Sequence, residues 1–152
     1  MTSSIPQFDI NPFLEGSEEG KHMVAFQIGQ AYRNIGYFTL NSNEDHQDLV
    51  DRVFSANREF HQLHLEEKEE ILISRSSHLS GYHPFSAESA DPNAKPDFKE
   101  AFDMALELPL DDPDVRAGRT FYGPNVWLRN PLNFRSTQEE YYQTLLELGE
   151  RI

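Results

Sequence analysis

The sequence predicts an α+β fold that is rich in helices and contains only a few strands. Apolar residues recur at the spacing of an amphipathic helix in three stretches, residues 18–34, 44–60 and 136–152. A fourth stretch, residues 101–108, alternates apolar and polar residues in the manner of a half-buried strand. Long segments rich in Gly, Pro and polar residues separate these elements, which is typical of loops.

Composition limits the classes of protein to which the chain can belong. Its 152 residues and 38% hydrophobic content suit a single domain, residues 1–152, with one modest core. The net charge of −13 repels phosphate groups, so we expect neither nucleic acid nor an anionic membrane surface as a partner. The sequence has no cysteine, which excludes disulfides and thiolate metal sites. The N-terminus resembles no signal peptide, and no apolar run reaches about 18 residues, so we expect a cytoplasmic protein.

The first quarter of the chain predicts a short strand, a helix and a second short strand. The segment IPQFDI, residues 5–10, reads as a short extended piece. Five apolar residues follow the helical period in and just after residues 18–34, namely Val24, Ile28, Ala31, Tyr32 and Ile35. Gly36 is a stop signal for this helix, and YFTL, residues 37–40, is prone to form a strand.

The second helix is predicted to begin after Ser42 and Asn43, which are both good N-cap residues. Its predicted core face consists of Leu49, Val53, Phe54 and Phe60. The segment HLEEKEEI, residues 64–71, continues as a charged helical turn. Residues 74–97 lose all periodicity and predict a long loop, and loops of such length are often functional.

The last third of the chain predicts one strand and one helix. One side of the strand carries Phe102, Met104, Leu106 and Leu108, and the other carries Asp103, Ala105 and Glu107. The helix is predicted to start with the capping box Ser136-x-x-Glu139, and its apolar stripe consists of Tyr141, Leu145, Leu148 and Ile152. The few predicted strands cannot cover this stripe. We therefore expect the helix 136–152 to pack against a further domain or against a second copy of the chain.

One short motif imitates an iron site. His46-Gln47-Asp48 spells H-x-D, His64 follows, and Arg75-Ser76-Ser77 spells R-x-S. In a facial triad on a barrel, the third ligand comes several strands after H-x-D. Here only a short interval separates Asp48 from His64, and its apolar residues follow the period of a helix. Residues two apart on a helix point about 200° apart, so His46 and Asp48 would face opposite sides. We interpret the stretch as the start of a helix.

A second candidate metal site consists of His61 and His64. Residues at i and i+3 share a helix face, so the two imidazoles could clip one metal ion. No third ligand stands at an obvious spacing, and a surface pair is the preferred interpretation. A small metal-binding protein built on these histidines is the weaker alternative.

Six segments stand in the order in which a known family carries similar ones: IPQFDI, IGQAYRNIGYFTL, FHQLHLEEKEEI, SGYHPF, KPDFKEAFDM and FYGPNVWL. Together they resemble the N-terminal region of the non-haem iron(II), 2-oxoglutarate-dependent oxygenases of the isopenicillin N synthase type. The resemblance covers nearly the whole chain. Two departures are NSN, residues 41–43, in place of the usual Asn-His-Gly, and His64 in place of a proline.

The resemblance implies a helix-rich part whose few strands extend a double-stranded β-helix (jelly-roll) barrel that lies downstream and is absent from this chain. It also implies iron(II) and 2-oxoglutarate as cofactors of the full-length protein. In the family, the iron ligands and the R-x-S that grips 2-oxoglutarate lie on that barrel. We therefore expect no catalytic and no metal-binding residue here, and no cofactor bound to this chain alone.

The loop that contains SGYHPF can reach the mouth of the active site in the family. The resemblance therefore implies that Leu79, Tyr82 and His83 contact substrate. The alternative is that Tyr82 packs its ring under the loop and His83 is solvated. A charge cluster is expected to hold the loop to the following strand, and it comprises Lys95, Asp97, Lys99 and Glu100. The aromatic residues Phe121, Tyr122 and Trp127 are expected to serve in packing.

Two functions remain open at this point. The first is the N-terminal structural and substrate-entrance portion of an iron(II)- and 2-oxoglutarate-dependent dioxygenase, not catalytic alone. The second is a free-standing module for protein interaction or dimerisation. A reading frame that continues with H-x-D, a distal His and R-x-S would separate them.

Overall fold

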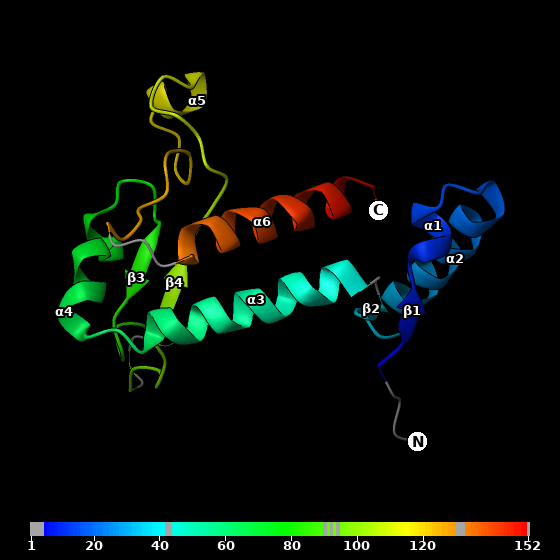
Figure 1. Cartoon of the computed structure of the whole chain (residues 1–152), viewed down its shortest axis with the longest axis horizontal. Coiled ribbons are helices and arrows are strands. Elements are labelled where there is room, and N and C mark those ends of the chain that lie inside the picture. The colour runs from blue at the N-terminus through cyan, green and yellow to red at the C-terminus, as the bar shows by residue number, and fades with distance from the viewer. Residues whose placement is uncertain are drawn as a thin grey trace. The chain divides into compact units, whose positions relative to one another are not determined.

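The computed structural model describes residues 5–41, 44–89, 91, 93, 95–129 and 133–151. The chain forms two compact units. The first unit contains the described residues up to Arg52 together with those from Thr144 onward, and the second contains those from Val53 to Gln143. Helices α3 (Glu44–His61) and α6 (Phe134–Arg151) each contribute residues to both units (Figure 1).

The first unit contains a two-stranded parallel sheet and two helices. Strands β1 (Gln7–Asp9) and β2 (Thr39–Asn41) lie in or at the end of the two predicted extended segments, and they pair with each other in parallel. Helix α1 (Asn11–Leu14) leads into α2 (Glu18–Asn34), which confirms the predicted bounds of that helix. The hydroxyl of Ser17 caps α2 by accepting a hydrogen bond from the backbone N–H of Gly20.

The core of the first unit is small. Its buried apolar residues are Ile10, Val24, Ala31 and Leu49. Gly20 permits the close approach of α1 and α2, because a Cβ at this position would collide with the backbone oxygen of Pro12. The predicted stripe is wrong at Tyr32, which is 60% exposed and lies edge-on to the Phe38 ring, with centroids 5.3 Å apart. Gly36 ends the helical region with φ of +91°, a conformation that glycine adopts without strain.

Helix α3 confirms the predicted second helix and its core face, with one correction. Val53 and Phe60 are buried, whereas Phe54 is 66% exposed. Val53 and Phe60 are seven residues apart and therefore share one face, and Phe54 lies about 100° away from it. The predicted N-cap residues, Ser42 and Asn43, lie outside the described residues.

The charged turn that follows α3 is a separate short helix. Helix α4 (Leu65–Lys68) begins after His64, whose backbone N–H donates to Oε2 of Glu67 at 3.3 Å. Two 3₁₀ turns follow, η1 (Glu69–Ile71) and η2 (Ile73–Arg75).

The second unit contains an antiparallel hairpin that the sequence predicted only in part. Strand β3 (Gly81–His83) pairs with β4 (Ala101–Asp103), and Figure 1 shows the two strands side by side. Within this pair, Tyr82 lies opposite Phe102. Strand β3 falls inside the segment 74–97, which was predicted to be a loop throughout. The three-residue strand carries no alternation long enough to detect from the sequence.

Strand β4 is shorter than the predicted strand 101–108. It ends at Asp103, and Leu106 is 41% exposed, so the predicted apolar side is not uniformly covered. Beyond Asp103 the side chain of Asn125 takes the place of a strand partner. Its Oδ1 accepts from the backbone N–H of Ala105 at 2.9 Å, and its Nδ2 donates to the Ala105 carbonyl at 2.8 Å.

The core of the second unit gathers aromatic rings around Phe60. Its buried residues are Ala56, Phe60, Ile71, Tyr82 and Phe134. The rings of Phe60 and Phe134 stack with centroids 4.5 Å apart, and Phe102 meets Phe60 edge-on at 5.5 Å. Aromatic pairs of this kind add to the free energy of area burial.

The start of α6 differs from its prediction. The helix begins at Phe134, so Ser136 lies within its first turn and is not the N-cap. The hydroxyl of Ser136 donates to the backbone oxygen of Asn133, and Glu139 pairs with Arg135 at 2.8 Å. A further short helix, α5 (Pro113–Arg116), lies in the segment that precedes α6.

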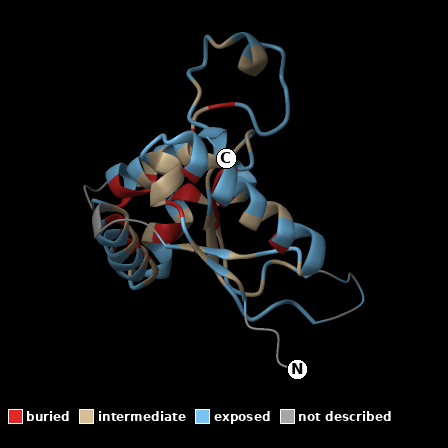
Figure 2. Ribbon diagram, turned by 90° about the vertical axis from the view of Figure 1, so that its right-hand side faces the viewer, coloured by how far each residue is buried: buried red, intermediate tan, exposed pale blue. Residues whose placement is uncertain are grey.

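The described residues leave much apolar surface uncovered. Ten hydrophobic residues among them are buried, whereas fifteen large hydrophobic residues are exposed. Figure 2 shows this as narrow buried (red) segments within ribbons that are largely intermediate or exposed. Within the described ranges, no helix combines the length and apolar character needed to cross a membrane.

Candidate functional site

The three residues predicted to contact substrate lie on and just before β3, but they differ in exposure. Leu79 is exposed and adopts φ of +56°, and Tyr82 is completely buried. His83 is partly buried. Gly81, between them, adopts φ of +135°, and a Cβ there would collide with the backbone oxygen of Ile71. The glycine therefore lets β3 lie directly against η1.

A polar network lies beneath the hairpin, and we call it the inner network. The Tyr82 hydroxyl donates a short hydrogen bond to Oε2 of Glu100. Nζ of Lys68 donates to the same oxygen at 2.7 Å and to the backbone oxygen of His61 at 3.2 Å. Nδ1 of His61 lies 3.2 Å from Oε1 of Glu100. Glu100 therefore joins α3, α4 and β3 through side-chain contacts.

Burial sets the electrostatics of the inner network. Lys68 is only 6% exposed, and its ammonium lies 5.2 Å from the centre of the Tyr82 ring. Burial, with the hydrogen bond to Glu100, raises the pKa of Tyr82 well above its ordinary value of 10. Burial also acts to raise the pKa of Glu100, but hydrogen bonds from Lys68 and Tyr82 outweigh it, and the pKa falls below 4.5. At neutral pH the network is therefore an ion pair with a neutral tyrosine.

The opposite side of the hairpin carries a second charged group, which we call the outer network. Nδ1 of His83 lies 3.0 Å from Oε1 of Glu88, and Nε2 lies 2.9 Å from Oδ2 of Asp103. Lys99 pairs with Oε2 of Glu88 at 2.6 Å. Hydrogen bonding to Lys99 lowers the pKa of Glu88, and the same contact raises the pKa of Lys99. The suggestion that His83 is solvated is therefore wrong, because two carboxylates hold it.

The expected charge cluster is confirmed in part. Lys99 ties the loop to the hairpin through Glu88, and the backbone N–H of Asp97 donates to the Glu88 carbonyl at 2.8 Å. Glu100 belongs instead to the inner network. Alternation along the strand explains why Lys99 and Glu100 belong to different networks. Residues 99, 101 and 103 point away from the core, and residues 100 and 102 point into it.

The aromatic residues of the second loop do not share one role. Trp127 packs against the core, with its ring 5.4 Å from Phe102. Phe121 and Tyr122 are exposed, so the expectation that they pack is wrong for these two residues. Neither is in the conformation of a strand, and Phe121 adopts φ of +69°.

The residues that imitate an iron site are placed as parts of helices. His46 and Asp48 both lie on α3, as the interpretation of this stretch as a helix start predicted, and Asp48 pairs with Arg52 at 3.1 Å. His64 precedes α4, and Arg75 lies in η2. Among the described residues, no group of three or more His, Cys, Asp or Glu is arranged to hold a metal ion. These residues therefore do not fit iron(II).

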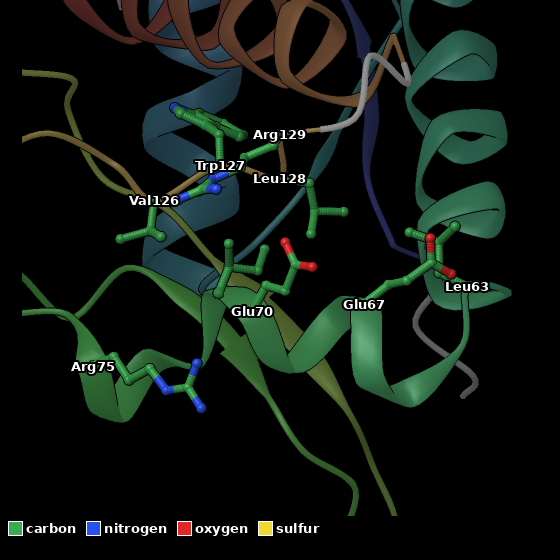
Figure 3. Close-up of a pocket in the computed structure, with 9 residues that line it drawn as sticks. Leu63, Glu67, Glu70, Arg75, Val126, Trp127, Leu128 and Arg129 are labelled. Carbon is green, nitrogen blue, oxygen red and sulfur yellow. The ribbon is translucent and has the colours of Figure 1, made fainter.

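One pocket of the second unit has no counterpart in the sequence predictions. It has a volume of about 680 Å³ and lies between the turns α4, η1 and η2 on one side and residues 126–129 on the other. Figure 3 shows charged and apolar side chains around it. The segment 64–71 was predicted only as a charged helical turn, and that prediction gave no indication of the pocket. It also gave no indication that Lys68 is buried and pairs with Glu100.

Sequence comparison shows similarity to the N-terminal part of dioxygenases. Residues 5–130 match the family described as "non-haem dioxygenase in morphine synthesis N-terminal". The 2-oxoglutarate-dependent dioxygenase citB of Monascus ruber is 33% identical over 149 residues, which are 95% of this chain and 44% of that protein. Clavatol oxidase claD of Penicillium crustosum is 31% identical, over 95% of this chain and 47% of that protein. The chain thus spans a little under half the length of these relatives.

Solved structures show the same fold. A putative 2OG-Fe(II) oxygenase family protein of Caulobacter crescentus matches 99% of this chain and 46% of its own, with a TM-score of 0.77 and 23% identity. A full-length protein of Neurospora crassa, solved in complex with alpha-KG and thymine, matches 95% of this chain and 45% of its own, with a TM-score of 0.72 and 24% identity. The chain therefore belongs to the non-haem dioxygenase N-terminal family and corresponds to the N-terminal portion of 2-oxoglutarate-dependent dioxygenases.

Proposed function

We propose that the chain is the structural and substrate-entrance portion of an iron(II)- and 2-oxoglutarate-dependent dioxygenase of the isopenicillin N synthase type, active in the cytoplasm. The iron ligands and the 2-oxoglutarate site belong to a barrel outside these residues. The observation that carries the proposal is the inner network, which fastens the hairpin to two helices. His83 lies on this hairpin, and Leu79 lies just before it. A fixed hairpin can present side chains to a substrate with little conformational freedom to lose.

The exposure of the three predicted residues divides their roles. Leu79 is exposed and can contact an apolar part of a substrate directly. Tyr82 is buried with its hydroxyl committed to Glu100, so it acts as a positioning residue for β3. Both nitrogens of His83 face carboxylates, so this residue contacts substrate only if the outer network opens.

The partner of this chain is proposed to be the downstream barrel or a second copy bound through the helix 136–152. Exposed apolar surface on α6 supports this, since Leu145 is 46% exposed. The same observation favours the second candidate function, a free-standing module for protein interaction or dimerisation. The barrel is the preferred partner because the chain matches the N-terminal part of dioxygenases that are about twice as long.

The reading frame that encodes this chain tests the proposal. A transcript that continues in frame beyond Ile152 with H-x-D, a distal His and R-x-S supports the dioxygenase portion. The proposal is contradicted if the transcript stops there and no separately encoded barrel co-purifies with the chain. The free-standing interaction module would then be the remaining function.

A further inference from the structure

The pocket between α4, η1, η2 and residues 126–129 has the size and lining of a binding site. Its volume of about 680 Å³ falls within the range of roughly 300–1,000 Å³ that ligand pockets occupy. Its apolar wall includes Leu63, Val126 and Leu128, which are partly buried and pack against the core of the second unit. An occupant would therefore cover apolar surface that the described residues leave half exposed.

Charges of both signs line the same pocket. Glu67 and Glu70 come from α4 and η1, and Arg75 and Arg129 come from η2 and the segment after Trp127. In Figure 3 the carboxylate of Glu70 points toward the segment 126–129, and Arg75 lies on the side of the pocket away from Leu63. The side chains of Glu70, Arg75 and Arg129 form no hydrogen bond or ion pair with the part of the chain that the structure describes. Three charged groups are therefore available to a ligand.

The presence of both carboxylates and arginines in one pocket limits the classes of molecule that can bind there. A dianion such as 2-oxoglutarate would meet Glu67 and Glu70 as well as the two arginines, and nucleic acid would meet the same carboxylates. A second copy of the chain brings a further net charge of −13, which opposes association. An occupant with one cationic group, one anionic group and an apolar part can pair with the carboxylates, pair with the arginines and cover the apolar wall.

We propose that this pocket binds a short amphoteric peptide segment of another polypeptide. Its basic side chain would pair with Glu67 and Glu70, its carboxylate with Arg75 and Arg129, and its apolar side chain would lie on the wall formed by residues 126–128. The assignment goes beyond the proposed dioxygenase function and does not depend on it.

Trp127 gives the experiment a direct signal, because it lines the pocket and is the single tryptophan of the chain. The probe is acetyl-lysyl-leucyl-glutamyl amide, titrated into the 152-residue chain while tryptophan fluorescence is recorded. We expect a saturable change with a dissociation constant of about 0.1–1 mM. The peptides with two lysines or two glutamates, and 2-oxoglutarate itself, should bind at least about tenfold more weakly, since each places one like charge against the lining.

A matched pair of variants locates the binding. Glu70→Lys should weaken binding of the mixed-charge peptide at least about tenfold. Glu66→Lys makes the same change four residues earlier, at an exposed position that does not line the pocket, and should leave binding unchanged. Equal effects of the two variants, or no saturable signal, would overturn the proposal. Binding of 2-oxoglutarate as tight as that of the peptide would also overturn it, because the occupant would then be an anion. A dimer in sedimentation that Glu70→Lys dissociates would overturn it too, because the occupant would then be a second copy of the chain.

Discussion

On the inner face of the β3–β4 hairpin, Glu100 meets a buried lysine and a buried tyrosine, whereas on the outer face His83 is held by Glu88 and Asp103, which are exposed. Both networks contain a lysine–carboxylate pair of similar length, 2.7 Å for Lys68–Glu100 and 2.6 Å for Lys99–Glu88. Their surroundings differ, because the side chain of Lys68 is 7% exposed and that of Lys99 is 52% exposed.

The comparison shows that distance alone does not determine what an ion pair contributes. A buried charge that loses its partner retains the full cost of its desolvation. An exposed charge that loses its partner is hydrated instead, so surface pairs contribute little. We therefore expect the inner network to fix the hairpin and the outer network to adjust the loop that precedes β4.

The largest effect is expected from Glu100→Ala. This change leaves the ammonium of Lys68 buried without its carboxylate, and we expect a loss of about 3–5 kcal/mol in the free energy of unfolding. Asp103→Ala is the matched change on the outer face of the same segment. It should cost under about 1 kcal/mol, because the Asp103 side chain is 54% exposed. Urea midpoints of the two variants give the comparison, and equal losses would mean that the two faces do not differ.

A smaller effect is expected from Tyr82→Phe, which removes only the hydroxyl that donates to Glu100. A hydrogen bond to a charged group contributes about 1.5–3 kcal/mol, and the aromatic packing around the ring is preserved. Tyr122→Phe makes the same change at an exposed tyrosine and should leave the thermal midpoint unchanged. If the Tyr82→Phe variant is as stable as the parent chain, the Tyr82 hydroxyl contributes nothing to the stability of the inner network.

The pH dependence of stability should separate the two sides of the inner network. The folded-state pKa of Tyr82 is raised, so its contribution is present below pH 10 and decreases above it, by up to about 1.4 kcal/mol per pH unit. The folded-state pKa of Glu100 is lowered, so its contribution is present above about pH 4.5 and is lost as the pH falls through the folded-state value. Urea midpoints from pH 3 to pH 11 record both effects. Tyr82→Phe should reduce the alkaline decrease to the part that the raised pKa of Lys99 contributes, and it should retain the acid decrease. If the alkaline decrease is the same in this variant as in the parent chain, it arises from groups other than Tyr82.

The smallest effect is expected on the outer face from Glu88→Gln. The variant keeps the shape of the side chain and removes the charge that pairs with Lys99 and His83. Salt screens exposed pairs, so the urea midpoint should fall slightly at low ionic strength and match that of the parent chain in about 1 M NaCl. A loss that persists in high salt would show that the outer network is as well shielded from water as the inner one.

The sequence predicted the long periodic elements and missed the features that depend on tertiary contact. Helix α2 was predicted with its observed bounds because its apolar spacing and the stop at Gly36 are both local signals. The alternation at Phe102 and Asp103 was also correct, but β4 ends there because Asn125, about 20 residues later, replaces the strand partner. No local pattern encodes that replacement.

The candidate site was predicted less well, for the same reason. The buried role of Lys68 could not be recognised within a run of glutamates, because its partner Glu100 lies 32 residues away. The position of Tyr82 under the loop was foreseen as an alternative and is confirmed by its burial. The contact of Leu79, Tyr82 and His83 with substrate stays a prediction.

We expect these residues to brace and position the entrance of an oxygenase whose iron ligands lie elsewhere. Anaerobic titration of the 152-residue chain with iron(II), followed by an assay of 2-oxoglutarate decarboxylation, tests it most directly. We predict binding no tighter than about micromolar and no turnover, because His46 and Asp48 lie two residues apart on a helix. Stoichiometric iron binding that is lost in the His46→Ala variant would contradict the account.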